Sequence, residues 1–207
     1  MTLACDCDGT LLDSERVFKE VSFAVLADLG LAMPEADYDR QIGLPDAALW
    51  ASWSRLGMSQ AVIDEARRRI SAKLGTTEIP LKSGFPDLLL HARDLGHRLV
   101  LATSASRRHV DRRVPAAVLA LFDRVITAES VTRRKPDPEI YLLARAAFPD
   151  QRTVVVEDSP PGVAAAVAAG CPCHLIPDLI ACDESVRRCC AGIHASASDL
   201  IGRLPGP

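Results

Sequence analysis

Short apolar runs alternate with helical patterns along most of this chain. Five segments have the apolar character of buried strands: 2–5 (TLAC), 97–104 (HRLVLATS), 123–130 (DRVITAES), 153–159 (TVVVEDS) and 173–177 (CHLIP). Helical segments are expected between them and at the C-terminal end: from Ser83 to Gly96, between the strands at 97–104 and 123–130, at 136–148 and 161–170, and from Ser198 to Pro205. Strands that alternate with helices predict an α/β fold, a doubly wound, Rossmann-like parallel sheet with helices on both faces.

The segment between the first two strands has a different pattern, because it contains no convincing strand. A helix is expected from Ser14 to near Gly30, further helices begin at Pro34 and Pro45, and residues 59–74 carry apolar side chains at helical spacing. We therefore predict a core domain formed by residues 1–15 and 81–207, and a small all-helical cap domain, residues 16–80, inserted after the first strand. Trp50 and Trp53 are expected in the core of that cap.

Composition narrows the classes of protein. The 207 residues include 24 Lys and Arg against 27 Asp and Glu, a net charge of −3, which gives no reason to expect nucleic acid or an anionic membrane as a partner. No apolar run approaches the roughly 20 residues of a membrane span, and no secretory signal is recognisable. The seven cysteines favour reduced thiols and a cytoplasmic location. Their spacing is not that of a zinc site.

Polar side chains gather where the predicted strands end. Asp6 and Asp8 follow the first strand, Thr103 and Ser104 the second, and Glu157 and Asp158 end the fourth, while Lys135 precedes a helix. In open α/β sheets these ends meet at one crevice. Clustered carboxylates repel one another unless a cation lies among them, and oxygen ligands suit Mg²⁺. A hydroxyl, a lysine and backbone N–H groups suit a phosphoryl group.

Four motifs resemble those of the haloacid dehalogenase superfamily. They are DCDGTLLDSE (6–15), LATSAS (101–106), RRKPDP (133–138) and VVVEDSPPGVAAAVAAG (154–170), and their order and spacing also fit. The resemblance covers the core, about two-thirds of the chain. One departure is the pair Cys5 and Cys7, which flank Asp6 where relatives often carry aromatic or aliphatic residues; this raises the question of oxidation sensitivity.

The resemblance implies a role for each motif residue. Asp6 would be the nucleophile that forms an aspartyl-phosphate, and Asp8 the general acid and base. Thr103, or Ser104 beside it, would hold a phosphoryl oxygen, and Lys135 would bridge the phosphoryl group and Asp6. The implied Mg²⁺ ligands are Asp6, the backbone carbonyl of Asp8, and Asp158, with Glu157 supporting the metal site; Thr10 is a candidate for substrate binding.

The resemblance favours a phosphatase but leaves alternatives. Dehalogenases of the superfamily lack the equivalent of Asp8, so dehalogenation is disfavoured. A β-phosphoglucomutase-like enzyme shares the chemistry up to the phosphorylated intermediate. A receiver-like signalling domain also combines acids, Mg²⁺, a hydroxyl and a lysine on a parallel sheet, but it has no helical insert.

Partners and substrate contacts are less defined. The cap loop IGLPD (42–46) resembles the loop that faces the active site in relatives, which makes Arg40, Gln41 and Asp46 candidates for contacts to the leaving group. We expect a small phosphorylated sugar or sugar acid as substrate, and a monomer or weak homodimer. The remaining histidines, including His109, His174 and His194, show no partner pattern and are expected to be structural or exposed.

Overall fold

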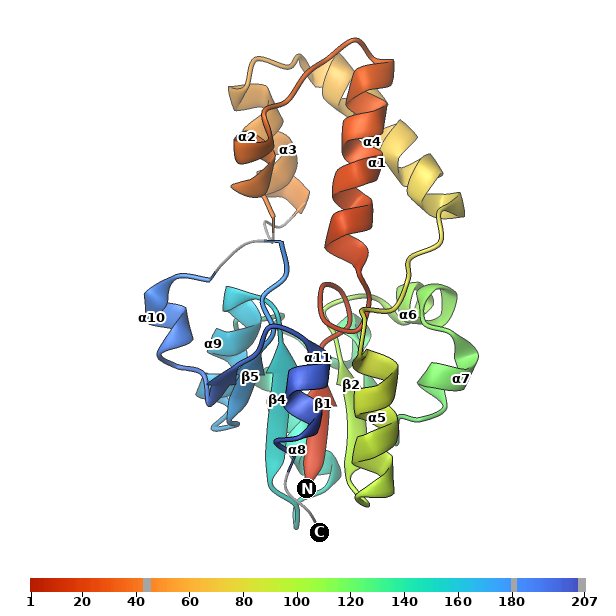
Figure 1. Ribbon diagram of the computed structural model, residues 1–207. Helices are drawn as coiled ribbons and strands as arrows, with labels where there is room; N and C mark the ends of the chain where they lie inside the picture. The colour runs from red at the N-terminus through yellow and green to blue at the C-terminus, as the bar shows by residue number, and fades with distance from the viewer. Residues whose placement is uncertain (43–45, 180–181, 205–207) are drawn as a thin grey trace. The chain divides into compact units, whose positions relative to one another are not determined.

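A computed structural model describes residues 1–42, 46–179 and 182–204 of the chain. The strands are β1 (Thr2–Cys5), β2 (Arg98–Ala102), β3 (Arg124–Ile126), β4 (Thr153–Glu157), β5 (Cys173–Leu175) and β6 (Gly192–Ile193). The helices are α1 (Ser14–Asp28), α2 (Glu35–Asp39), α3 (Asp46–Arg55), α4 (Gln60–Thr76), α5 (Phe85–Asp94), α6 (Arg107–Arg113), α7 (Ala116–Leu119), α8 (Glu139–Ala147), α9 (Pro160–Ala168), α10 (Glu184–Arg187) and α11 (Ala197–Ile201), with a 3₁₀ turn at Ala128–Ser130 (Figure 1).

The strands form one parallel sheet in the order β3-β2-β1-β4-β5-β6. β1 therefore lies in the middle, paired with β2 on one side and β4 on the other. All four of its residues are buried, which explains why TLAC reads as a continuous apolar run instead of an alternating one. The predicted α/β fold with a doubly wound parallel sheet is confirmed.

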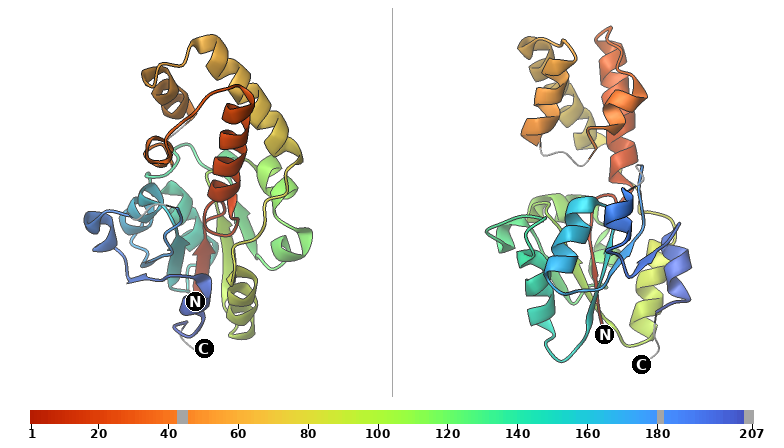
Figure 2. Two further views of the ribbon diagram at one scale, coloured as in Figure 1. Left: turned by 45° about the horizontal axis from the view of Figure 1, so that its top comes forward. Right: turned by 90° about the vertical axis from the view of Figure 1, so that its left-hand side faces the viewer.

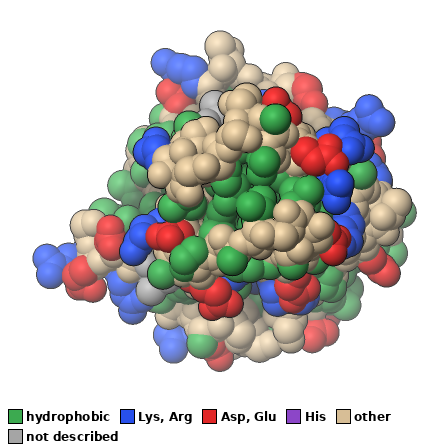
Figure 3. All heavy atoms as spheres, turned by 90° about the horizontal axis from the view of Figure 1, so that it is seen from above, with side chains coloured by type: hydrophobic (Ala, Val, Ile, Leu, Met, Phe, Trp, Pro, Cys, Tyr) green, Lys and Arg blue, Asp and Glu red, His purple; other side chains and the backbone are tan. Residues whose placement is uncertain are grey.

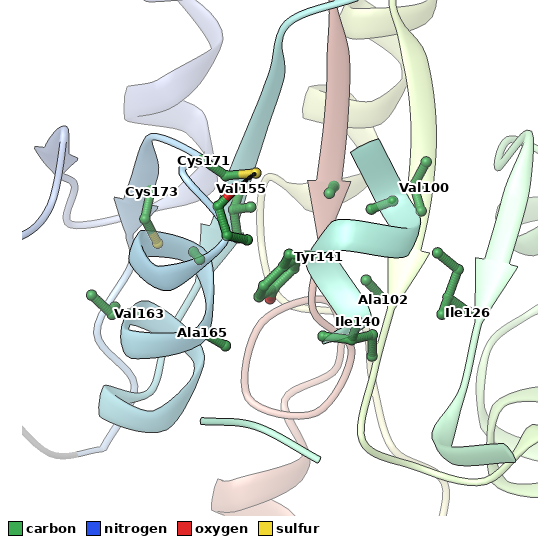
Figure 4. Packing of buried hydrophobic residues seen from close by; sticks show 14 of the residues in the cluster. Val100, Ala102, Ile126, Ile140, Tyr141, Val155, Val163, Ala165, Cys171 and Cys173 are labelled. Carbon is green, nitrogen blue, oxygen red and sulfur yellow. Dashed lines mark hydrogen bonds between the residues drawn. The ribbon is translucent and has the colours of Figure 1, made fainter. Parts of the chain in front are cut away.

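Helices cover both faces of the sheet. Figure 2 shows α8 and α9 on one side and α5 and α11 on the other. The α8–α9 side encloses a tightly packed cluster in which the small side chains of α9, Ala165 and Ala166 among them, let that helix approach the strands. The fully buried Tyr141 ring of α8 lies within this cluster (Figure 4). Aromatic residues are scarce in this chain, so Val, Ala, Leu and Cys fill most of the volume.

The chain divides into two compact units. One comprises Met1–Asp13 and Pro80–Pro207 and carries the sheet; the other comprises Ser14–Ile79 and is helical. Within the helical unit α1 packs along α4, and Ser59 caps the first turn of α4 by accepting a hydrogen bond from Val62 N. Trp53 is fully buried in this unit.

Two linkers join the units, and they run side by side within the sheet unit. Asp13 N donates to Pro80 O at 2.9 Å, and Lys82 N donates to Leu11 O at 2.9 Å. On the face seen in Figure 3, hydrophobic side chains gather near the centre, with acidic and basic side chains mixed around them. No helix in the described part of the chain is long and apolar enough to cross a membrane.

Several element boundaries differ from the sequence prediction. The last helix begins at Ala197, not after Ser198, because Ser196 and Asp199 form a reciprocal capping box, and it ends at Ile201. β3 is limited to three residues, since the chain turns into the 3₁₀ segment directly after Thr127. The prediction also missed β6 and the one-turn helix α10, which are too short to show a periodic pattern. The predicted helix start at Pro45 lies outside the described residues.

Candidate active site

Asp6 lies at the point where the chain leaves β1. Its N–H donates to Val156 O of β4 at 3.1 Å, which fixes it between the two central strands. The chain fills the sheet outward from β1 to β3 and then, in the opposite direction, from β4 to β6. Ligands of open α/β sheets bind beyond the strand ends at such a switch point. Asp6 and the end of β4 therefore occupy the position where a ligand is expected.

Lys135 connects the two acidic strand ends. Its Nζ donates to Asp6 Oδ1 at 2.5 Å, to Glu157 Oε1 at 2.7 Å and to Ala102 O at 3.0 Å. Burial alone would lower the pKa of Lys135, but the carboxylates of Asp6 and Glu157 outweigh it and raise the pKa well above its usual range. The ammonium therefore stays charged, and all three of its protons are directed at defined acceptors.

Glu157 is fully buried, and both of its oxygens accept hydrogen bonds. Oε1 accepts from Lys135 and from the Tyr141 hydroxyl at 2.6 Å, while Oε2 accepts from Ser159 Oγ at 3.1 Å and from Asp158 N at 3.2 Å. Burial and the Glu157 carboxylate raise the pKa of Tyr141 well above its usual value, so its hydroxyl remains a donor. Because both oxygens already accept hydrogen bonds, Glu157 is better suited to binding Lys135 than to binding a metal directly.

Asp158 packs against the loop that follows β1. Thr10 is fully buried, and its Oγ1 donates to Asp158 Oδ1 at 2.7 Å, so Thr10 contacts the acidic cluster. Gly9 has a φ of +78°, and a Cβ at this position would collide with the Asp158 carboxylate. The turn at Gly9 thus serves the close approach of the loop to Asp158. Lys82 Nζ fixes the same loop by donating to Gly9 O at 2.5 Å and pairing with Asp178 at 2.8 Å.

The carboxylates of Asp6, Glu157 and Asp158 form an all-oxygen cluster. Each offers an oxygen, and these oxygens lie within 4.8 Å of one another. Burial raises the pKa of Asp6 to about 7 against the lowering effect of Lys135, and neighbouring carboxylates add to the rise. Burial also raises the pKa of Asp158, again with help from Glu157 and Asp6. The single positive charge of Lys135 does not balance the negative charges of the three carboxylates.

The donor set fits a hard divalent cation. In the described part of the chain, the hydrogen bonds of Asp6 and Asp158 use only Oδ1 of each, which leaves Oδ2 of each for a ligand. Carboxylate and carbonyl oxygens are what Mg²⁺ prefers, and its charge would relieve the repulsion that raises these pKa values. The residues present therefore suit the Mg²⁺ that the sequence predicts.

Thr103 and Ser104 follow β2 at the same edge of the sheet. Thr103 is almost fully buried; its N–H donates to Ile126 O, and its Oγ1 accepts from Ala105 N at 3.0 Å. With that bond in place, the hydroxyl proton of Thr103 can still be donated to a ligand. Ser104 is partly exposed and lies one residue further along the turn.

Asp8 contacts a residue that the sequence analysis did not select. His109 Nε2 lies 3.0 Å from Asp8 Oδ1, although the two residues are 101 positions apart. A lone histidine on a basic helix carries no recognisable signal. The one clue in the sequence is that His109 follows the second motif by only a few residues. α6 therefore begins at the edge of the sheet where β2 ends. Tyr141 was missed for a similar reason, since its apolar ring follows the helical pattern of α8.

The cap residues fall into three cases. Gln41 is buried within the helical unit; its Nε2 donates to Asp37 O and its Oε1 accepts from Trp53 Nε1 at 2.8 Å, so its amide serves packing there. Arg40 is exposed and pairs with Asp37 at 2.5 Å. The Asp46 side chain lies outside the described residues, as does most of the IGLPD loop.

The flanking thiols of Cys5 and Cys7 are buried. Burial raises the pKa of both, and the nearby Asp6 carboxylate adds to the effect. Since the thiolate is the form that oxidants attack, these thiols are protected in spite of their position. All seven cysteines carry free thiols in the structure.

A family model described as haloacid dehalogenase-like hydrolase matches residues 1–170. The chain belongs to this family. Its relatives include the protein CbbY of Cereibacter sphaeroides, 35% identical over 83% of this chain and 82% of that protein. Another is a phosphorylated carbohydrates phosphatase of Thermotoga maritima, 32% identical over 80% of this chain and 79% of that protein.

The fold of this chain is also similar to that of a solved structure of the family. The crystal structure of CbbY from Rhodobacter sphaeroides in complex with phosphate superposes with a TM-score of 0.70 at 26% identity, and covers 96% of this chain and 95% of that chain. The predicted superfamily is confirmed, and so is the prediction of an enzyme of the phosphoric monoester hydrolase type, through its phosphatase relatives. Family membership also removes the receiver domain as an alternative.

Proposed function

We propose that this protein is a Mg²⁺-dependent phosphatase that hydrolyses a small phosphorylated sugar through an aspartyl-phosphate on Asp6. The observation that carries the proposal is the contact of Asp6 Oδ1 with the buried Lys135 ammonium, beside Asp158 at the switch point of the sheet. A carboxylate held in this way has a fixed orientation, and the lysine limits its negative charge.

In the first step an oxygen of Asp6 attacks phosphorus. The new bond is Asp6 O–P, and the bond between phosphorus and the substrate oxygen breaks. Asp8, in its protonated form, gives its proton to that departing oxygen, so the product leaves as an alcohol. Lys135 stays positive throughout and stabilises the charge that builds on the phosphoryl oxygens.

In the second step water replaces the enzyme. Asp8, now a carboxylate, takes a proton from the attacking water, whose oxygen bonds to phosphorus. The Asp6 O–P bond breaks, inorganic phosphate is released and both carboxyl groups return to their starting state. Mg²⁺, when bound by Asp6, Asp158 and the Asp8 carbonyl, would neutralise phosphoryl charge and orient the group for in-line attack.

The remaining predicted residues receive supporting roles. Thr103 is our choice for the phosphoryl hydroxyl, because Ser104 is more exposed and lies one residue further along the turn. Thr10 orients Asp158. We propose the helical unit as the cap that supplies specificity, with Arg40 and Asp46 as candidate substrate contacts; Gln41 is not retained, since its amide is used in packing.

The names of two relatives support the proposed substrate class. The Thermotoga maritima relative is named for phosphorylated carbohydrates, and an Escherichia coli relative, 32% identical, is a hexitol phosphatase. Both names support a phosphorylated sugar or polyol for this chain. We further propose that it acts in the cytoplasm as a monomer or weak homodimer.

A screen of phosphorylated metabolites with Mg²⁺ tests the proposal. Released phosphate and isomerised sugar are read from the same reactions, with Asp6→Asn as the inactive control. We expect phosphate release from one or a few sugar phosphates, abolished by chelation and restored by Mg²⁺ better than by Ca²⁺, which is larger and takes more ligands. Isomerised sugar without net phosphate release would indicate a mutase, and full activity in chelator would overturn the metal assignment.

A further inference from the structure

The carboxylate of Asp8 has one hydrogen-bond partner in the described part of the chain, and that partner is His109. Nε2 of the ring lies 3.0 Å from Asp8 Oδ1, and both side chains are about two-thirds buried. When Asp8 is ionised its carboxylate can only accept, so the contact is then made by the tautomer of His109 that carries its hydrogen on Nε2. Asp8 itself lies beyond the end of β1, where its backbone forms an isolated bridge with Leu12.

The position of His109 is set independently of Asp8. Its N–H donates to Ser106 Oγ at 3.2 Å, the N-cap bond of α6. The first residue of that helix, Arg107, donates its N–H to the Glu129 carboxylate at 3.0 Å. Glu129 is in turn held by Thr127 Oγ1 at 2.7 Å. The backbone at the start of α6 is therefore held by the Ser106 cap and by the Glu129 carboxylate. The imidazole of His109 extends from this held segment and can act as a donor to Asp8.

This arrangement divides the two oxygens of Asp8 between two tasks. Oδ1 accepts from His109, which restricts rotation of the carboxyl group about its last torsion. Oδ2 is then the oxygen presented for proton exchange. Without the donor, the carboxyl group would rotate and spend less time in the orientation needed, and a small misplacement of a catalytic group has a large effect on rate.

We propose that His109 is a positioning residue that orients Asp8 as the general acid and base. The inference rests on the proposed phosphatase mechanism, in which Asp8 exchanges the proton. It requires no charge on His109, only an Nε2–H donor.

Three variants separate this role from a general effect on folding. His109→Leu removes the donor but keeps a side chain of similar bulk. His109→Gln retains an N–H donor at about the same reach as Nε2. Arg108→Ala is the matched control, because Arg108 is an exposed cation on the same helix whose side chain makes no hydrogen bond or ion pair with another described residue. Thermal unfolding of all three, compared with wild type, establishes that they fold.

The assay compares an aryl phosphate with a sugar phosphate. An aryl leaving group needs little protonation, so the burst of phenol release from His109→Leu should be close to that of wild type. Turnover of the sugar phosphate should fall by about tenfold or more, part of the 10²–10⁴ that a missing acid/base group costs, with little change in KM. Rapid quench should show phosphoenzyme accumulating, because dephosphorylation also needs Asp8.

Rescue and a double-mutant cycle complete the test. We expect His109→Gln to recover most of the sugar phosphate rate, and His109→Leu to have no further effect in an Asp8→Asn background, since the residue it positions is gone. An equal loss in the rate of the phosphorylation step with both substrates, full additivity with Asp8→Asn, or a His109→Gln variant no better than His109→Leu would overturn the inference. If wild type forms no phosphoenzyme, the proposed function fails instead, whatever His109 does.

Discussion

Glu157 shows at the scale of a single residue how tightly this site is specified. Its two oxygens accept from Lys135, Tyr141, Ser159 Oγ and a backbone N–H, and every one of these partners is a donor. Glu157→Gln would place an amide NH₂ against one pair of donors and leave the buried Lys135 with one carboxylate fewer. The substitution is therefore far from conservative.

We expect Glu157→Gln to lower the free energy of unfolding by on the order of 3 kcal/mol, the effect of breaking a buried charged pair. Tyr141→Phe removes one hydrogen bond to the same oxygen and should cost about 1.5 kcal/mol. Urea unfolding of both variants beside wild type gives the comparison. A Glu157→Gln variant as stable as wild type would mean that the carboxylate does not hold Lys135 as described.

Asp158 should behave in the opposite way in the absence of metal. Its carboxylate is buried close to those of Glu157 and Asp6, and its raised pKa reflects burial and their repulsion. We expect Asp158→Asn to stabilise the metal-free protein by about 1 kcal/mol and to lose the rise in melting temperature that Mg²⁺ gives wild type. The matched control is Asp94→Asn, an exposed residue of α5 that changes the same charge.

Thermal unfolding with and without MgCl₂ provides that measurement. If Asp158→Asn retains the full shift on addition of Mg²⁺, the ion binds elsewhere. If Asp94→Asn stabilises the protein as much, the effect comes from net charge and not from the cluster.

Sequence reasoning could select the motif residues from their positions along the chain, and it could not select their partners. Asp6, Glu157, Asp158 and Lys135 stand at strand ends or in recognisable motifs. His109 and Tyr141 lie on helices whose patterns are explained by solvent exposure and core packing. Only the three-dimensional arrangement of α6 and α8 against the sheet reveals what these two side chains contact.

At the scale of elements, α9 is fitted closely to the end of β4. Gly162 lies in the first turn of α9, where Ser159 Oγ accepts from its N–H at 3.3 Å. A Cβ at Gly162 would collide with the Glu157 carboxylate. Replacing glycine by alanine inside a helix ordinarily stabilises it by about 0.5–1 kcal/mol, but here the methyl group would displace the residue that holds Lys135.

We expect Gly162→Ala to lower both stability and phosphatase rate, in spite of the gain in helix propensity. Gly202→Ala is the matched control, since a Cβ at Gly202 meets nothing within 4 Å and its φ is −72°. Chemical denaturation and a phosphate-release assay on the two variants decide the matter. A Gly162→Ala variant that matches or exceeds wild type in stability would show that the approach of α9 to Glu157 is not strict.

The elements that carry a clear apolar pattern were predictable, and those without one were not. Segments such as α4 and β4 carry a periodic or continuous apolar pattern together with clear boundary residues, and the structure forms them where expected. β6 consists of two residues and is defined by pairing with β5 across the sheet. No local pattern encodes such a strand, because its existence depends on tertiary contacts.

At the scale of the whole molecule, pH should affect stability through a histidine pair on β5 and just after β6. His174 Nδ1 lies 2.8 Å from His194 Nε2, so one neutral ring donates to the other. The sequence analysis gave neither residue a partner. Burial lowers the pKa of both, and for His174 the neighbouring His194 lowers it further.

Because the folded-state pKa values of these two rings are lowered, the rings bind more protons in the unfolded chain than in the folded one as the pH falls through about 6.5, the ordinary pKa of histidine. The stability contributed by the neutral pair is thus complete above that pH and is lost as the pH falls. We expect the free energy of unfolding of wild type to decline more steeply between pH 7 and pH 5 than that of His174→Gln. If the free energy of unfolding of wild type and of His174→Gln changes equally with pH, the histidine pair is not the source of the pH dependence.

The covalent role of Asp6 is the central claim, and trapping the intermediate tests it most directly. Enzyme is mixed with a labelled phosphate ester and Mg²⁺, quenched in acid within milliseconds, digested and analysed by mass spectrometry. We expect label on the peptide that contains Asp6, formed as fast as turnover requires, and no label on Asp6→Asn, which should retain less than about 1% of the wild-type rate. Steady turnover without a labelled Asp6 peptide, or an active Asp6→Asn variant, would contradict the account.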